Sequence, residues 1–490
     1  METIELGKRR EMFWDDYLID TERTTAFHRS LPALKKESCF LFDRGRELDN
    51  VAWTCLASGE RGYRMYYVVW NETYDGTNAF VIESDDGLTW KRARVNEPDS
   101  GLEENRIVLP GLEDALFVFR DPNPACPPEE KYKAAARATC VCEDGEKRRG
   151  LWSWTSPDGY RFGPPRLIST HGTFDSMSTV HWANGRYVCY HRNQHGLGRD
   201  GTIVECTDSN RIGDYVRQLA GKGKRDIRRI TSEDFIHWSE PEMIGFDDGA
   251  EIDLYDNQII PYPTAPHILV GFPTRYASRD NWTPNEEQFA SSWTKKQAKK
   301  NYGEWRCGLA TTDCVAMHSR DGIVWRRGSE PFITPGYEEE HNWVYGDCYP
   351  AYGMIDSGRE TYWMYCAERY RSPGYPKPLY RYEIRRDGLG CIMADGAERV
   401  VVTKPLIFEG TVLHLNFESS ACGYIRTEVL DADGNALPET YPTKCFEVYG
   451  NSVDRSVYFE NGMFFLGYMG RPVRLRFTLC EAKLYSMRFE

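Results

Sequence analysis

Ser84-Asp85-Asp86-Gly87-Leu88-Thr89-Trp90 is the most informative stretch of this chain, because it returns along the sequence. Further copies start at Ser156, Ser232 and Ser319, and a remnant without the aromatic residue lies at 386–388. In such a copy the Ser and Asp side chains satisfy turn amides, and the Gly takes a positive φ. The heptad predicts a tight turn between two strands, and its recurrence predicts a structural repeat.

The chain between the turns repeats a fixed order of strand-like runs. A run with an acidic residue comes first, followed by a short loop, an aromatic-rich run, a third run and the turn. Four strands per unit in five units are typical of a five-bladed β-propeller, an all-β fold whose closed ring exposes only short edges. The apolar residues of Arg10–Asp20 suggest that this segment supplies the strand that closes the ring.

Two helices are expected within the repeat. Thr283-Pro284-Asn285-Glu286 is a capping box, which predicts a helix over about 284–300. This helix is either a lid over the ring or a surface decoration. Asp208–Leu219 predicts a second, short helix.

The pattern changes near Lys404. Leu413, Leu415 and Phe417 alternate with polar residues, as do the residues of 473–479. This alternation is typical of half-buried antiparallel sheet. We therefore expect a propeller over residues 1–403 and a β-sandwich over residues 404–490.

Composition excludes several classes of partner. The net charge of −13 argues against nucleic acid, since phosphate would be repelled over most of the surface. The sequence contains no run of 18 apolar residues, so no membrane span is expected. The N-terminus lacks the apolar stretch of a signal peptide. The 15 cysteines show no Cys-x-x-Cys pair, so we expect reduced thiols in a cytoplasmic protein with neither metal nor cofactor.

Carboxylates recur at similar places in the units. Counted back from the aromatic-rich run, they are Asp49, Asp121, Asp175, Asp256 and Asp347. The first strand of each propeller blade lines the central channel, so these side chains are expected near one mouth. Acids that face one pocket push each other's pKa values apart, as general acid and base chemistry requires.

One tetrapeptide carries a family resemblance. Phe119-Arg120-Asp121-Pro122 resembles the Arg-Asp-Pro signature of glycoside hydrolase family 32, whose propeller and sandwich the chain also resembles as a whole. Families 43, 62, 68 and 130 share that propeller. The resemblance implies a blade-one Asp as nucleophile, Asp121 as transition-state stabiliser and a blade-three Glu as acid. Asp49 matches by position only, because the family's Asn-Asp-Pro-Asn-Gly is absent, and Asp175 stands where a Glu is expected.

The catalytic candidates are therefore Asp49 as nucleophile or base, Asp121 as stabiliser, and Asp175 as acid, with Glu251 as the alternative acid. Each has a structural reading as well, as a turn, an ion-paired strand end or a solvated loop. The substrate-binding candidates, in which aromatic residues stack on a sugar and polar ones bind hydroxyls, are Arg120, Asn50, Trp53, Trp182, Asp253, His341 and Asp347.

The expected function is hydrolysis of short oligosaccharides. By family analogy the best substrate class is a terminal furanoside, fructosyl or arabinosyl. Two alternatives stay open: an inverting phosphorylase of the family 130 kind, with a basic phosphate site, and a non-catalytic carbohydrate-binding propeller. Retention or inversion of the anomeric configuration is also open. A separation of about 5 Å between the two catalytic carboxyl groups would indicate retention, and one of about 6.5–9.5 Å would indicate inversion. A homo-oligomer formed through the sandwich is a further possibility.

Overall fold

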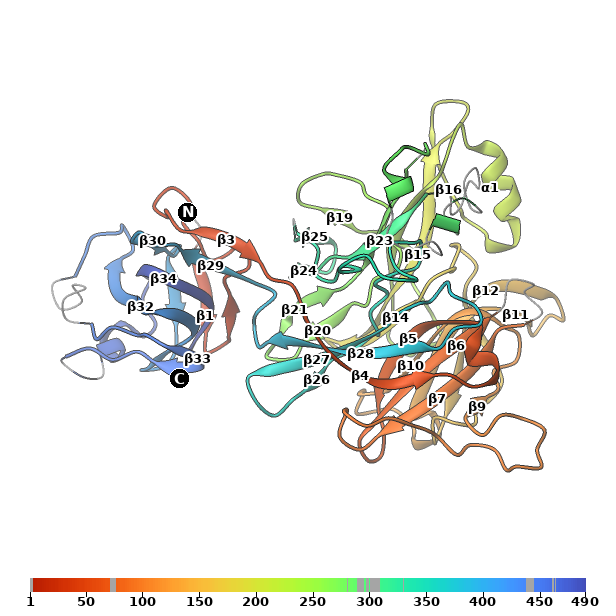
Figure 1. Cartoon of the computed structure of the whole chain (residues 1–490). Coiled ribbons are helices and arrows are strands. Elements are labelled where there is room, and N and C mark those ends of the chain that lie inside the picture. Colours follow the sequence, from red (N-terminus) through yellow and green to blue (C-terminus); the bar gives the residue numbers. More distant parts are fainter. Residues whose placement is uncertain are drawn as a thin grey trace.

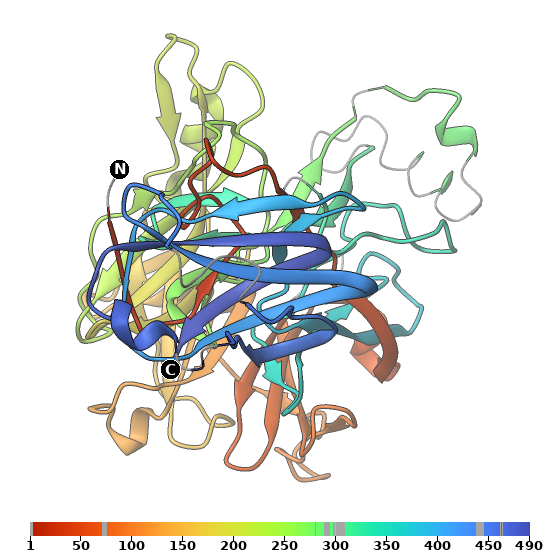
Figure 2. The same cartoon turned by 90° about the vertical axis from the view of Figure 1, so that its left-hand side faces the viewer.

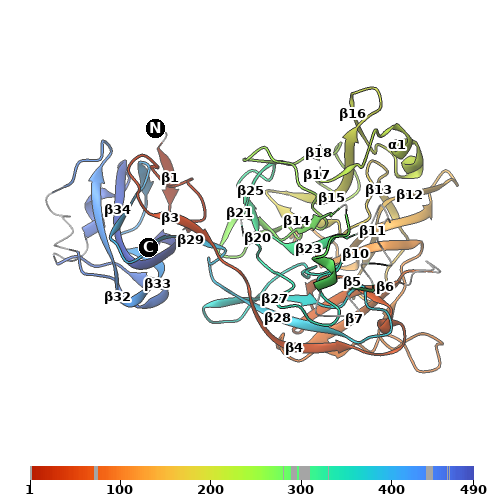
Figure 3. The ribbon, with the colours of Figure 1, turned by 45° about the horizontal axis from the view of Figure 1, so that its top comes forward.

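The computed structural model describes residues 3–70, 76–279, 281–288, 295–296, 299, 309–328, 330–437, 445–460, 462 and 464–490. Figure 1 shows two lobes, a larger one made of five blade sheets and one further strand pair, and a smaller one that contains both termini. The larger lobe is the predicted five-bladed β-propeller, and its sheets are arranged as a ring in Figure 3.

The first two blades follow the predicted strand order. Blade 1 consists of β5 (Asn50–Ser58), β6 (Tyr63–Trp70), β7 (Asn78–Ser84) and β8 (Lys91–Arg92), with β9 (Arg106–Ile107) paired to β7. Blade 2 consists of β10 (Leu112–Arg120), β11 (Tyr132–Val141), β12 (Lys147–Ser156) and β13 (Arg166–Ser169).

The other three blades carry the additions. Blade 3 consists of β14 (Thr179–Ala183), β15 (Arg186–Leu197), β17 (Lys224–Ser232) and β18 (Glu242–Met243), with β16 (Ile203–Glu205) on β15. Blade 4 consists of β20 (Ile260–Tyr262), β21 (Ala265–Gly271), β24 (Met317–Ser319), β25 (Val324–Arg327) and β19 (Gly245–Phe246), and a separate pair is formed by β22 (Thr274–Ala277) and β23 (Thr311–Cys314). Blade 5 consists of β26 (Ile355–Asp356), β27 (Thr361–Ala367), β28 (Lys377–Arg385) and β4 (Leu34–Phe42).

The repeated heptad is the predicted turn. The Gly87 N–H donates to Ser84 Oγ (2.8 Å), and the N–H groups of Leu88 and Thr89 donate to Asp86 Oδ1 (2.8 and 2.9 Å). The turns at 156, 232 and 319 repeat these bonds. In the turn at 232, Phe235 replaces the glycine and takes a φ of 65°.

Three of the turns also fasten one blade to the blade before it. Tyr66 of β6 donates its hydroxyl to the carbonyl of Gly159 (3.0 Å), and Tyr190 of β15 does the same to Gly322 (2.9 Å). A Cβ on Gly322 would lie 2.4 Å from that hydroxyl, so only glycine fits there. Tyr365 of β27 donates to Gly87 (2.6 Å), which joins blade 5 to blade 1.

The prediction for the closing strand was wrong. The outermost strand of blade 5 is β4, which crosses from the smaller lobe and pairs antiparallel with β28 (Figure 1). β2 (Glu11–Met12) instead pairs with β34 (Val473–Phe489), and Phe13 and Leu18 are buried in the core of the smaller lobe. An outermost strand needs no apolar face, and the apolar residues of the Leu34–Phe42 segment gather at its end instead of alternating, so the segment gave no strand pattern.

The smaller lobe contains one connected sheet of nine strands. Figure 2 shows it from the side opposite the propeller, with the long pair β32 and β34 in front. Its strands are β1 (Ile4–Gly7), β2, β3 (Phe27–Ser30), β29 (Gly390–Ala394), β30 (Arg399–Val402), β31 (Leu406–Phe408), β32 (Leu413–Asp431), β33 (Asn451–Ser456) and β34. The sandwich and the boundary at 403/404 stay predictions, although pairing also places the strands of 4–30 and 390–402 in this sheet.

The degenerate fifth turn joins the two lobes. Asp387 is fully buried and accepts from Arg10 (2.9 Å), Asn416 (3.1 Å) and Thr264 (2.8 Å). The Trp14 indole donates to the carbonyl of Asp387 (2.7 Å). This position therefore ties blade 4, the N-terminal segment and the C-terminal sheet together.

The helices given below for the described residues are short. The predicted helix at 208–219 is confirmed as η3 (Ser209–Arg211) followed by α1 (Ile212–Gln218), and further short turns are η1 (Gly45–Leu48), η2 (Pro128–Glu130), η4 (Glu286–Gln288) and η7 (Phe464–Tyr468). Glu286 accepts from the Thr283 N–H (2.8 Å) as the capping box requires, but most of the predicted helix at 284–300 lies outside the described residues. Among the described residues, no helix is both long and apolar enough to cross a membrane.

Candidate active site

A cavity of 830 Å³ lies where the first strands of the blades begin. All five blades contribute to it: Trp53, Trp70, Gly76, Thr77, Leu112, Glu113, Asp114, Arg137, Arg149, Thr173, Asp175, Gln194, Tyr255, Tyr345, Tyr370 and Arg371. Ile212 and Val216, one turn apart on α1, add an apolar wall. The cavity thus combines carboxylates, guanidinium groups and aromatic rings, as sugar-binding pockets do.

Asp114 is the carboxylate of blade 2 in this cavity. It lies near the start of β10, next to a left-handed residue, Ala115 (φ 54°), and its Oδ2 accepts from Arg137 (2.8 Å). Burial raises the pKa of Asp114 to about 6, against the opposing charge of Arg137, and the charge of Asp175 adds to the rise. A carboxyl group with this pKa can donate a proton near neutrality.

Asp175 is the carboxylate of blade 3 in the same cavity, so the structure brings this predicted residue to the mouth of the channel. Its Oδ1 accepts from the Thr173 hydroxyl (3.0 Å) and lies 3.7 Å from Arg192 Nε. Phe174, just before it, is left-handed (φ 51°). Thr173 and Arg192 thus fix the orientation of the Asp175 carboxyl group in the cavity that Asp114 also lines, while the catalytic role of Asp175 stays a prediction.

Asp256 of blade 4 lies buried behind the cavity wall. Its Oδ1 accepts from the Met177 N–H (3.2 Å), and its Oδ2 has no hydrogen-bond partner among the described residues. Burial raises the pKa of Asp256 to about 6, and the charge of Asp114 contributes. Three aspartates from neighbouring blades therefore influence one another electrostatically around the channel.

Aromatic rings form the rest of the cavity wall. Tyr345 and Tyr255 share a short hydroxyl–hydroxyl hydrogen bond, with ring centroids 5.7 Å apart. The Arg371 guanidinium lies over the rings of Trp70 (5.1 Å) and Tyr345 (4.6 Å). Trp53, a predicted substrate-binding residue, packs edge-on against Tyr370 (5.7 Å) and lines the cavity.

Three other predicted residues lie at the opposite mouth of the propeller. Asp121 follows the end of β10, about 20 Å from Asp114 at the usual strand rise. Its carboxylate is fully buried and accepts from Lys133 (2.8 Å) and Tyr187 (2.6 Å). Trp182 packs on the Tyr187 ring (4.7 Å) and Arg120 donates to the Gly59 carbonyl (3.2 Å). The Arg-Asp-Pro segment is thus a structural ion pair, because β10 carries it away from the cavity.

The blade-one candidates lie near the cavity without lining it. Asn50 is buried and pairs with Trp70, whose ring lines the cavity. Asp49 follows η1 and lies near the amine of Lys377, whose pKa is lowered to about 8 by burial despite the charge of Asp49. Asp49 is not among the residues that line the cavity, and its assignment as nucleophile stays a prediction.

The two blade-four candidates support other groups. Glu251 is more than half exposed and pairs with Lys224 (2.7 Å), outside the cavity. Asp253 accepts from the Arg225 N–H (2.8 Å), and Arg225 lies over the rings of Tyr255 (5.2 Å) and Tyr276 (4.3 Å). Asp253 thus acts behind the aromatic wall, and Glu251 is a surface ion pair.

His341 and Asp347 also lie outside the large cavity. Both line a separate chamber of 20 Å³, with Cys348, Cys366 and Glu368 among its other residues. His341 is buried, and its ring packs at a tilted angle against that of Tyr375, with centroids 4.2 Å apart. Neither residue lines the large cavity, and their expected role in binding stays a prediction. No group of three potential ligands able to hold a metal ion occurs in the described part of the chain.

Asp114 is the residue that sequence reasoning missed. Counting back from Tyr132 selected Asp121, 11 residues upstream, because Asp114 lies 18 residues upstream, near the far end of the nine-residue β10. A signal for Asp114 was present in the sequence, because the acidic pair Glu113-Asp114 lies at the start of an otherwise apolar strand. The resemblance of residues 120–122 to the Arg-Asp-Pro signature directed the choice to Asp121 instead.

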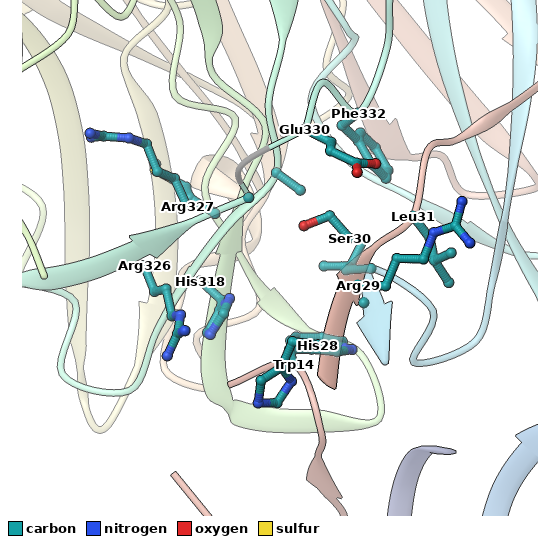
Figure 4. Close-up of a pocket in the computed structure, with 15 residues that line it drawn as sticks. Trp14, His28, Arg29, Ser30, Leu31, His318, Arg326, Arg327, Glu330 and Phe332 are labelled. Carbon is teal, nitrogen blue, oxygen red and sulfur yellow. The ribbon is translucent and has the colours of Figure 1, made fainter. Parts of the chain in front are cut away.

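A second cavity, of 220 Å³, lies at the seam between the lobes (Figure 4). Its two histidines are already paired, His28 with Asp16 (2.8 Å) and His318 with Asp15 (2.9 Å). Figure 4 shows Arg29 and Arg327 extending away from the centre. This cavity lacks the facing carboxylates of the first one.

The sequence matches no family model and no curated protein. Solved structures do match at low identity. An N-acetylgalactosamine deacetylase from F. plautii is 12% identical, with a TM-score of 0.42 over 75% of this chain and 96% of that one. The GH32 beta-fructofuranosidase of Bombyx mori is 8% identical, with a TM-score of 0.38 over 94% of each chain. An alpha-L-arabinofuranosidase from Fusarium graminearum is 8% identical, with a TM-score of 0.38 over 73% and 98%. With TM-scores below 0.5, the function must be argued from the cavity.

Proposed function

We propose that this chain is a glycoside hydrolase whose active site is the 830 Å³ cavity, with Asp114 as the proton donor and Asp175 as the nucleophile or base. One observation carries the proposal. Carboxylates from two adjacent blades share one cavity in different surroundings, and burial raises the pKa of Asp114 to about 6. Two carboxyl groups in unlike surroundings are the usual catalytic pair of glycosidases.

The surrounding groups suit a sugar. Aromatic faces such as Trp53 and Tyr345 offer stacking surfaces, while Arg137 and Gln194 offer hydrogen-bond donors for hydroxyl groups. The volume accommodates the end of a short oligosaccharide. A terminal fructosyl or arabinosyl furanoside is the substrate class that we propose, on the family resemblance of the sequence.

The test is turnover of short fructosyl and arabinosyl oligosaccharides by the purified protein and by its D114N and D175N variants. Product release that both variants lose, with folding intact by circular dichroism, supports the proposal. Sugar binding without turnover in the unmodified protein would instead identify a carbohydrate-binding propeller. The anomeric form of the first product, read by NMR, distinguishes retention from inversion.

A phosphorylase is the second candidate, because three guanidinium groups line the cavity beside the carboxylates. Arg137 pairs with Asp114 and Arg149 with Glu113 (2.7 Å), and Arg371 completes the set. Turnover that requires inorganic phosphate and releases a sugar phosphate would favour this function over hydrolysis.

A further inference from the structure

The loop that places Tyr345 in the cavity has a strained backbone. His341, Trp343 and Cys348 have φ values of 80°, 60° and 58°, and Gly346 has a φ of 112°. Left-handed backbone is costly for residues other than glycine and persists only where the surroundings enforce it. Three such residues within eight positions show that specific contacts hold this loop.

Asp347 provides the central contact. Its Oδ2 accepts from the N–H of Val344 (3.0 Å), three residues earlier, so the side chain closes the turn that contains Tyr345. Its carbonyl accepts from the Thr312 hydroxyl of β23 (2.8 Å), and the N–H of Gly346 donates to the same hydroxyl (3.2 Å). Asp347 is 7% exposed. Thr312 and Asp347 therefore hold the Tyr345–Gly346 segment from both sides.

The turn fits tightly against the cavity wall. A Cβ added to Gly346 would lie 2.6 Å from the Tyr370 ring and 2.8 Å from Cγ of Arg371, both of which line the cavity. Tyr345 itself contacts Tyr255, Tyr276 and Arg371. A small shift of the turn would therefore displace several groups that surround the substrate.

We propose that Asp347 is a positioning residue, which holds Tyr345 in the cavity wall while it is ionised and releases that hold when it is protonated. This inference rests on the proposed function, because it describes how the same cavity keeps its shape. An ionised carboxylate accepts hydrogen bonds more strongly than a protonated one, so the turn is held best in the charged state.

The surroundings of Asp347 bring its protonation into the range near neutral pH. Burial raises the pKa of Asp347 to about 7, against the lowering effect of the Val344 N–H, and the charge of Glu368 raises it further. The 20 Å³ chamber beside it has room for one water molecule. Other titratable or charged groups line this chamber or lie next to it: Lys35 on β4, Cys366 on β27, Arg369 after β27, Tyr382 on β28, and Glu339, Glu340, His341 and Cys348 on the loop itself.

Glu368 is the neighbour to vary, because its negative charge raises the pKa of Asp347. Lys35 pairs with it (2.5 Å), and the Tyr382 hydroxyl donates to it (3.4 Å). Removing its charge lowers the pKa of Asp347 without touching the Val344 turn. Glu368→Gln is therefore a matched variant that moves the transition to lower pH and leaves the high-pH state unchanged.

The first test uses no substrate. Hydrogen exchange of the segment 340–349, followed by mass spectrometry and corrected for intrinsic rates, is compared at pH 6 and pH 8. We expect faster corrected exchange at pH 6, no such difference in D347N, and a transition at lower pH in E368Q. Equal corrected exchange at both pH values in the unmodified protein would overturn the proposal, whether or not the protein is an enzyme.

The second test is kinetic. We expect KM to rise by about fivefold from pH 8 to pH 6, as an ionic hydrogen bond is lost, and D347N to show the raised KM at both pH values. T312V removes the bridging hydroxyl, so it should raise KM at all pH values without moving the transition. A D347N variant with the KM of the unmodified protein at pH 8 would contradict a positioning role.

Discussion

The two ends of β10 carry aspartates in opposite situations. Asp121, at one mouth of the propeller, has three donors in place: Lys133, Tyr187 and the Asn123 N–H (2.9 Å). Asp114, at the other mouth, has one strong partner, Arg137, and faces a second carboxylate across a cavity. Asp121 is a saturated structural charge, whereas Asp114 keeps capacity for a ligand and a proton. A buried ion pair alone therefore does not identify a catalytic acid.

The sharpest test of this comparison is the pair of substitutions D114N and D121N. We expect D114N to lower kcat by about 10²–10⁴-fold, because a general acid contributes that much. D121N should keep kcat within about threefold when assayed below its unfolding temperature, since its site lies at the other mouth. Loss of turnover in D121N with folding intact would reverse the assignment.

The D114N and D121N variants should also differ in their free energy of unfolding. D121N leaves the buried Lys133 ammonium with only the more distant Glu130 carboxylate (3.5 Å) as a charged partner, so the free energy of unfolding should fall by about 3–5 kcal/mol in urea titration. K133M in combination with D121N is the control, because it removes the stranded charge and should recover part of the loss. An unchanged urea midpoint in D121N would mean that water solvates this site.

The pH profile sharpens the comparison further. Asp114 must be protonated to act as an acid, so kcat/KM should fall up to tenfold per pH unit above its pKa of about 6. Protonation of Asp347, whose pKa is about 7, should add a fall in kcat/KM of at most about fivefold on the acid side. D347N should remove this step and leave the fall above the pKa of Asp114 in place.

Glu251 provides the smallest expected effect. It is an exposed partner of Lys224 outside the cavity, and exposed ion pairs contribute about 0–1 kcal/mol. E251Q should therefore change kcat/KM by less than about twofold and leave the unfolding midpoint nearly unchanged. A loss comparable to that of D114N would show that the blade-four loop reaches the substrate.

The turn repeat and the short helix at 208–219 were predictable from local chemistry. Ser, Asp and Gly at fixed spacing close a turn with their own backbone, and these bonds involve residues no more than three apart. Asp175 was found because it lies 12 residues before the aromatic-rich strand at Tyr187, a spacing close to that of the other selected aspartates. Asp114 was missed because it lies 18 residues before Tyr132, farther from the aromatic-rich strand than any of the aspartates that the count selected.

The sequence alone determined the number of blades and the alternating character of the C-terminal strands, because both are periodic and arise from neighbouring residues. The tertiary structure decided which carboxylates share a cavity. Left-handed residues such as Trp53 (φ 48°) and Ala115 bend the first strands at their entry, and no sequence pattern marked those bends. The closing strand β4 and the pKa values of Asp114 and Asp347 depend likewise on distant segments, because burial and facing charges exist only once the ring is closed.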